Sequence, residues 1–154
     1  MNYLVKMNEL EFYKYIEEKE KRYAETLAQH IFEVTEPADV QARKQLQGFL
    51  PKGFQTELHE FFNIIEDGHI CGYVWLKVDD TKKSAFLYEI YLFDECRSKG
   101  VGKKVMKEIE GYLKMKEILY FKLHVFGTNY KAIKLYETLG FEVAGINMYK
   151  EIYS

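Results

Sequence analysis

Arg97-Ser98-Lys99-Gly100-Val101-Gly102 is the stretch of this chain that decides its fold. It follows an apolar run, residues 85–93, that is typical of a strand, and it precedes an amphipathic run, residues 103–116, whose spacing predicts a helix. Glycine lets a backbone come close to a ligand, and the free N–H groups in the first turn of a helix attract an anion. The sequence therefore predicts a phosphate-binding turn, and three lysines add positive charge to it: Lys99, Lys103 and Lys104.

The length and composition of the chain predict one soluble domain, residues 1–154. Its 22 basic and 24 acidic side chains argue against nucleic acid as a partner, because nucleic-acid-binding domains usually carry a basic excess. The sequence has no apolar stretch long enough to span a membrane and no secretory signal pattern, so we expect a cytoplasmic protein without a membrane partner. The histidines and the two cysteines, Cys71 and Cys96, lack metal-ligand spacing, so we expect free thiols and no metal site.

The first third of the chain is predicted to be helical. Asn8 and Glu11 have the spacing of a capping box at the start of a helix. Four residues then recur at helical spacing: Tyr23, Ala24, Leu27 and Ile31. A second helix is predicted from near Thr35, with Pro37 in its first turn, to a point before Pro51.

The pattern then changes to that of strands. Residues 61–66 and 70–76 are predicted as a hairpin, because Asp67-Gly68 between them is a strong turn signal. A polar turn leads to a long strand, residues 84–93.

After the glycine turn and its helix, residues 119–126 are predicted as a strand that pairs in parallel with residues 84–93, through a right-handed crossover. A short helix over residues 130–139 follows, and residues 141–153 are predicted as a last strand. The expected fold is α/β, with a mixed, mostly antiparallel sheet, a central parallel strand pair and helices on both faces.

Two common phosphate-binding turns do not fit. A Walker A turn would need glycine at Arg97, and the dinucleotide turn would need a small residue at Val105 and an acidic residue at the end of the next strand. Arg97-x-x-Gly100-x-Gly102 instead resembles the acetyl-CoA turn of the GNAT superfamily of N-acetyltransferases. Residues 123–141 also resemble a motif of that family, L-x-V-x-x-x-N-x-x-A-x-x-L-Y-x-x-x-G-F, which is complete here. The resemblance covers residues 61–150.

This resemblance implies a GNAT-like fold and acetyl-CoA as co-substrate. It implies that the backbone of Ile90, Tyr91 and Leu92 binds the pantetheine arm where the two parallel strands separate, and that a backbone N–H near Leu92 holds the oxyanion of a tetrahedral intermediate. The diphosphate would be held by the turn and its flanks: Arg97, Ser98, Lys99, Gly100, Val101, Gly102 and Lys103. Asn129, Ala132 and Tyr136 would lie near the cofactor, and Asn129 has the alternative role of capping the helix that begins at Tyr130.

Three residues are candidates for catalysis. The resemblance implies that Tyr136 donates a proton to the departing thiolate of CoA, although an ordinary core tyrosine has the same pattern. Glu89 is the only charged residue in its strand, so it is either a base with a raised pKa or a member of a buried ion pair. His124, in the neighbouring strand, is the competing base, with a hydrogen bond to the backbone as its alternative, and ordered water can also serve. Cys96 is interpreted as a buried filler.

The acceptor is expected to be a primary amine, either a small molecule or a peptide N-terminus. Its pocket is expected between the N-terminal helices, residues 50–60 and the first strands, where aromatic and acidic side chains occur together. The alternative is a non-catalytic acyl-CoA-binding module that senses the cofactor. The last strand, residues 145–153, supports either a homodimer or the core of a monomer.

Overall fold

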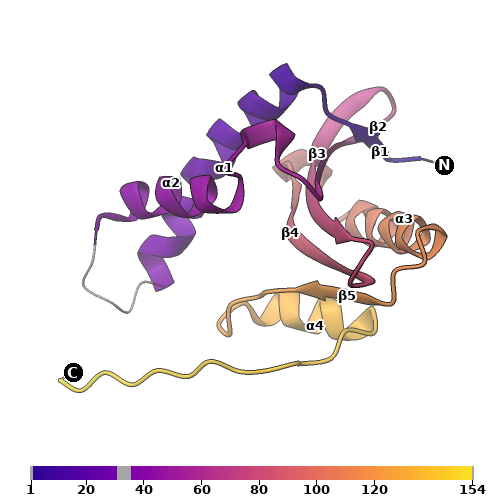
Figure 1. Cartoon of the computed structure of the whole chain (residues 1–154). Helices are drawn as coiled ribbons and strands as arrows, with labels where there is room; N and C mark the ends of the chain where they lie inside the picture. The colour runs from indigo at the N-terminus through magenta and orange to yellow at the C-terminus, as the bar shows by residue number, and fades with distance from the viewer. Residues whose placement is uncertain (1, 31–35, 154) are drawn as a thin grey trace.

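The computed structural model describes residues 2–30 and 36–153, and it contains a five-stranded sheet of order β1-β2-β3-β4-β5 (Figure 1). The first three pairings are antiparallel, and β4 (Ser84–Leu92) and β5 (Tyr120–Leu123) pair in parallel. This confirms the mixed sheet predicted from the sequence. Within the described ranges no helix is long and apolar enough to cross a bilayer.

The N-terminal third is helical after a short strand, β1 (Leu4–Lys6). Helix α1 (Glu9–His30) begins with the predicted capping box: the Asn8 amide donates to Glu11 Oε1 at 2.9 Å, and the Glu11 amide donates to Asn8 Oδ1 at 2.8 Å. Helix α2 (Ala38–Phe49) follows, with Pro37 immediately before its first residue. The predictions for Ile31 and Thr35 lie outside the described residues.

The predicted hairpin is confirmed as β2 (His59–Glu66) and β3 (His69–Asp79), joined by a turn in which Asp67 and Gly68 have φ values of 51° and 79°. On β3, Gly72 lies opposite Leu92 of β4. A Cβ atom at Gly72 would lie 1.9 Å from the Tyr91 carbonyl oxygen, so only glycine fits there. This residue lets β3 approach the end of β4 closely.

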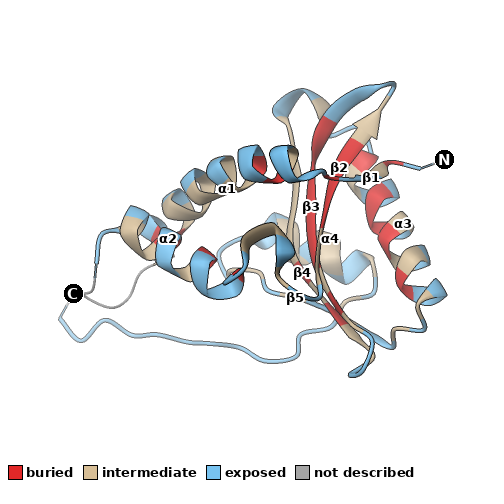
Figure 2. Cartoon of the chain, turned by 45° about the horizontal axis from the view of Figure 1, so that its top comes forward, coloured by how far each residue is buried: buried red, intermediate tan, exposed pale blue. Residues whose placement is uncertain are grey.

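Two helices cover each face of the sheet (Figure 1). Helices α3 (Val101–Met115) and α4 (Tyr130–Thr138) pack against one apolar core, and α1 and α2 pack against a second core on the other face, around Trp75. Short 3₁₀ turns at Gly53–Gln55 and Asp94–Cys96 connect the elements. Buried residues are concentrated along β2 and β3 and on the side of α3 that faces the sheet (Figure 2).

Two sequence predictions differ from the structure at the C-terminal end. The strand predicted over residues 119–126 is shorter, since β5 spans only Tyr120–Leu123. The last strand predicted over residues 141–153 is wrong: this segment is extended and almost entirely exposed, and it forms no strand. Alternating apolar residues indicate a strand only when a neighbouring strand is available, and this segment runs away from β5 (Figure 1).

Candidate functional site

The glycine turn places the N-terminus of α3 directly after the end of β4. Ser98 and Gly100 have positive φ values, 62° and 80°, and Gly100 precedes the first helical residue without a capping side chain. The first backbone bond of the helix runs from the Lys104 amide to the Gly100 oxygen at 3.3 Å. The earlier N–H groups of the helix therefore have no helical acceptor, and they leave an opening for an anion.

Arg97 fixes this turn to the strand before it. Its Nε atom donates to the Leu92 carbonyl oxygen at 2.8 Å, and its guanidinium lies 2.9 Å from Asp94. On the other side of the turn, a Cβ atom at Gly102 would lie 3.6 Å from the Leu92 side chain. The structure thus brings the turn and the end of β4 together, as the sequence pattern predicts. Lys99 and Lys103 are exposed beside the turn.

The parallel strands separate at the same end of the sheet. Pairing between β4 and β5 ends at Leu87 opposite Leu123, whereas β4 continues to Leu92 and is paired there only with β3. In the described part of the chain, the edge of residues 88–92 that faces β5 is therefore without a strand partner. Open backbone at the carboxyl ends of parallel strands is a common place for ligands.

Tyr136 on α4 packs against the same apolar core as Ile90 and Leu92. Its ring lies 5.6 Å from that of Phe141, and no described residue forms a hydrogen bond with its hydroxyl. Burial raises the pKa of Tyr136. This is opposite to the shift that would match the phenol to a thiol, because burial disfavours the charged phenolate.

Asn129 lies immediately before α4 and caps the N-terminus of that helix. Its Oδ1 atom accepts a hydrogen bond from the Ala132 amide at 3.2 Å and so caps α4. Asn129 is exposed, and its role toward a cofactor stays a prediction.

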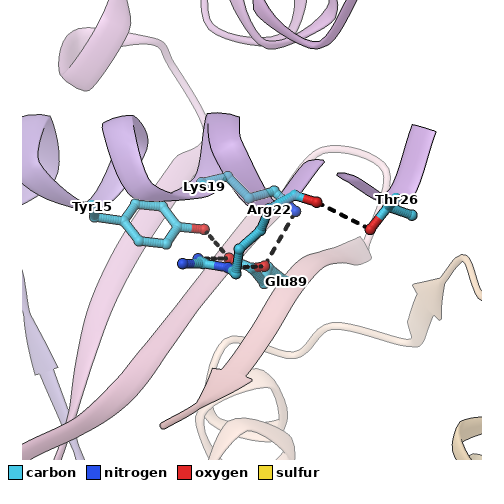
Figure 3. A network of polar contacts seen from close by, with 5 residues as sticks. All are labelled: Tyr15, Lys19, Arg22, Thr26 and Glu89. Atoms are coloured by element: carbon cyan, nitrogen blue, oxygen red, sulfur yellow. Dashed lines mark hydrogen bonds and ion pairs between the residues drawn. The ribbon is translucent and has the colours of Figure 1, made fainter. Parts of the chain in front are cut away.

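Glu89 is held in a polar network between β4 and α1 (Figure 3). Its carboxylate accepts a hydrogen bond from the Tyr15 hydroxyl at 2.8 Å and forms ion pairs with Lys19 at 3.3 Å and Arg22 at 2.8 Å. Burial alone would raise the pKa of Glu89, but the two cations and the Tyr15 hydroxyl together lower it. The raised pKa expected for a base is wrong here, and the buried ion pair is what forms.

His124 lies just beyond β5 and is exposed. Its ring is perpendicular to the Phe126 ring, with the two centres 4.9 Å apart, and no described residue is hydrogen-bonded to it. Phe126 in turn stacks on His30, at the end of α1, at 4.0 Å, and His30 Nε2 lies 3.2 Å from Thr128 Oγ1. The last turn of α1 therefore contacts the segment that connects β5 to α4.

The sequence analysis missed the contribution of α1 to this region. Arg22 lies 3.9 Å from the centre of the Tyr91 ring, and Arg97 lies 5.3 Å from it, so two guanidinium groups contact one tyrosine of the candidate site. No local sequence motif marks Lys19, Arg22 or His30 as residues of a site. In addition, about 70 residues separate Arg22 from Tyr91 in the sequence. The one available signal was the lone charge of Glu89, which requires a cation from elsewhere in the chain.

The region expected to hold the acceptor contains an open groove of about 410 Å³ between the end of α2 and the start of β2. His59 lies in it, and its Nδ1 atom accepts a hydrogen bond from Trp75 Nε1 at 2.9 Å. Burial and the nearby Lys77 lower the pKa of His59 to about 4, so its ring is neutral at neutral pH. Cys71 and Cys96 are free thiols, and among the described side chains no three His, Cys, Asp or Glu residues come together to hold a metal ion.

Comparison with known proteins identifies the family. The model of the acetyltransferase (GNAT) family matches residues 14–141. The N-acetyltransferase YycN of Bacillus subtilis (strain 168) is 28% identical over 97% of both chains, and mycothiol acetyltransferase of Acidimicrobium ferrooxidans is 33% identical over 66% of this chain and 32% of its own length.

Solved structures agree with this result. The crystal structure of YycN from Bacillus subtilis superposes with a TM-score of 0.90, over 98% of both chains at 27% identity. The PaiA N-acetyltransferase of Thermoplasma acidophilum, in complex with coenzyme A, shares the fold with a TM-score of 0.68, over 94% of this chain and 91% of that one at 23% identity. This chain belongs to the acetyltransferase (GNAT) family and uses acetyl-CoA as its acetyl donor.

Proposed function

We propose that this chain is an N-acetyltransferase that transfers acetyl from acetyl-CoA directly to a primary amine, on a small molecule or at a peptide N-terminus. One observation carries the proposal. The open N-terminus of α3 and the separation of β4 from β5 lie at the same end of the sheet, and Tyr136 packs against the core that both share. A diphosphate needs an anion site, and a pantetheine arm needs an extended backbone edge. A departing thiolate needs a proton donor such as a phenol.

The donor would be held mainly by backbone groups. The N–H groups of Val101, Gly102 and Lys103 lie in the first turn of the helix and would donate to the diphosphate, while Ser98 and Gly100 shape the turn. Lys99 and Lys103 add positive charge. The edge of Ile90, Tyr91 and Leu92 would pair with the amides of the arm, as one strand pairs with another.

The acid of the reaction is assigned to Tyr136. When the amine attacks the acetyl carbonyl, the bond from carbon to sulfur breaks and the thiolate takes up a proton. The raised pKa keeps the Tyr136 phenol protonated at neutral pH, so a proton is available there. A backbone N–H near Leu92 would hold the developing oxyanion.

The base is assigned to His124 or to a water molecule beside it. Glu89 already accepts bonds from Tyr15, Lys19 and Arg22, and its lowered pKa makes it a poor acceptor for a proton of an ammonium ion. We therefore propose a positioning role for Glu89, through α1. His124 is exposed beside the perpendicular Phe126 ring, so a substrate or water can reach its side chain.

The decisive experiment is a panel of amines with acetyl-CoA, monitored by release of free thiol. The panel contains polyamines, aminoglycosides and peptides with free N-termini, none of which carries a thiol, with the N-blocked form of each as its control. The proposal predicts thiol release with at least one class of free amine and none with its blocked form. Binding of acetyl-CoA without turnover on any amine would favour a non-catalytic acyl-CoA-binding module.

A further inference from the structure

The two cysteines of the chain lie beside each other in the fold. Cys71 is a buried residue of β3. Cys96 is the last residue of the 3₁₀ turn Asp94–Cys96, and it packs, partly buried, against the apolar core that contains Cys71. The Cys71 thiol is hydrogen-bonded to Cys96, and both thiols are free in this structure. The fold therefore brings together two thiols that the sequence separates.

Backbone hydrogen bonds fix the position of both cysteines. The Phe93 amide donates to the Cys71 carbonyl oxygen at 2.8 Å, and the Cys96 amide donates to the Phe93 carbonyl oxygen at 2.9 Å. The chain thus leaves β4 opposite Cys71 and folds back by one short turn, which places Cys96 beside β3. A cysteine side chain is short, so a hydrogen bond between two thiols requires that their backbones lie close together, as a disulfide does.

This pair of thiols adjoins the glycine turn at residues 97–102. Arg97 follows Cys96 directly, and it is bound to the Leu92 carbonyl oxygen at 2.8 Å and to Asp94 at 2.9 Å. Asp94 begins the same 3₁₀ turn that ends at Cys96. A displacement of Cys96 therefore also displaces Arg97 and the start of the glycine turn. Hydrogen bonds from N–H groups need donor–acceptor distances of about 2.7–3.2 Å, so a small displacement is enough to weaken them.

We propose that Cys71 and Cys96 form a reversible disulfide that weakens the binding of acetyl-CoA at the glycine turn. The inference rests on the proposed donor site. The oxidant is the disulfide of a low-molecular-weight thiol. The Cys96 thiolate attacks one sulfur of this disulfide and releases the first small thiol, and Cys71 then attacks the Cys96 sulfur and releases the second. The two protein thiols lose two electrons and two protons in total, and the small disulfide gains them.

The surroundings of the two thiols set the order of these steps. Burial and the hydrogen bond with Cys96 raise the pKa of Cys71 to about 12, so Cys71 stays protonated at neutral pH and reacts only with a sulfur already in contact with it. Cys96 is less buried, so a small disulfide reaches it first. A covalent bond holds two sulfur atoms closer together than a hydrogen bond does, so oxidation draws Cys96, and with it the glycine turn, toward β3.

The test treats the protein with oxidised glutathione, removes the excess, and measures the intact mass and the Kd of acetyl-CoA by calorimetry. We expect the wild type to lose two hydrogen atoms and to carry no glutathione. The Kd of acetyl-CoA should rise by about tenfold or more, because the N–H groups of the turn no longer fit the diphosphate. Treatment with dithiothreitol should restore both the mass and the Kd.

Two variants serve as controls. Cys96→Ser cannot form the disulfide, so it should bind acetyl-CoA like the reduced wild type before and after oxidation. Cys71→Ala has no second thiol to displace glutathione, so it should keep glutathione on Cys96.

Three results would contradict the proposal. A wild type that stays reduced or keeps glutathione would overturn the disulfide, and an equal Kd in both redox states would overturn its control of binding. Either result leaves the proposed donor site intact. A reduced wild type that does not bind acetyl-CoA would overturn the donor site together with its control by the thiols.

Discussion

At the scale of single residues, the environment of Tyr136 determines which chemistry it can perform. Burial raises its pKa, so the phenol is protonated at neutral pH. A raised pKa also weakens the phenol as an acid, so its contribution depends on direct contact with the leaving sulfur. The structure supplies the apolar surroundings for this role, and the sulfur comes with the substrate.

Tyr136→Phe removes the hydroxyl and keeps the ring that packs near Phe141. We expect kcat to fall by about 100-fold or more, as for loss of a general acid, while the Kd of acetyl-CoA stays nearly unchanged. Tyr130→Phe on the same helix, at a position 77% exposed, is the control and should be neutral. Steady-state kinetics with a good amine check both variants, and normal turnover by Tyr136→Phe would remove the acid role.

His124→Ala tests the proposed base. We expect kcat/KM for the amine to fall by about 100-fold, with recovery as the pH rises and the amine loses its proton without help. The exposed His69→Ala on β3 is the matched control. A pH profile identical to that of the wild type would assign the proton transfer to water alone.

At the scale of elements, the N-terminus of α3 and the contact between α1 and β4 define the site. The first turn of α3 presents N–H groups without a capping side chain, and Arg97 ties this turn to Leu92. On the other face, Glu89 connects β4 to three side chains of α1 (Figure 3). We propose that the N-terminus of α3 binds the donor, and that the contact between α1 and β4 fixes the helices beside which the acceptor would lie.

Gly102→Glu places a carboxylate where the diphosphate is expected. A negative charge at a helix N-terminus does not disfavour the fold, but it repels a phosphate, so the Kd of CoA should rise by about tenfold or more. Gly111→Glu, in the same helix with open space around it, is the control and should bind CoA normally. Calorimetry measures both, and unchanged affinity in Gly102→Glu would exclude this turn as the diphosphate site.

Glu89→Gln leaves two cations without their partner, and we expect the free energy of unfolding to fall by about 3 kcal/mol. The lowered pKa means that the ionised carboxylate stabilises the wild-type fold at neutral pH, and this stabilisation is lost as the pH falls below about 4.3. The difference in the free energy of unfolding between the wild type and Glu89→Gln should therefore become smaller at acidic pH. Glu20→Gln, which breaks an exposed pair with Arg43, should cost less than about 1 kcal/mol. Urea unfolding at several pH values measures the free energy of unfolding of each variant. Equal losses of this free energy in Glu89→Gln and Glu20→Gln would contradict the prediction.

At the scale of the whole molecule, local patterns predicted most of the fold. The capping box of Asn8, the turn at Asp67-Gly68 and the glycine turn at residues 97–102 are determined by neighbouring residues, and the structure contains all three. The partners of Glu89 lie about 70 positions away, so the sequence showed that this charge needed compensation but not by which residues. The path of residues 141–153 depends on which elements lie beside them, and the alternation of apolar residues does not show that.

The most direct test of the central claim is a crystal structure of the chain with coenzyme A. The account predicts the diphosphate on the N–H groups of residues 101–103, the arm along residues 90–92, and the sulfur within roughly 3–4 Å of the Tyr136 hydroxyl. Coenzyme A bound elsewhere, or bound at this end of the sheet with its sulfur far from Tyr136, would contradict the account.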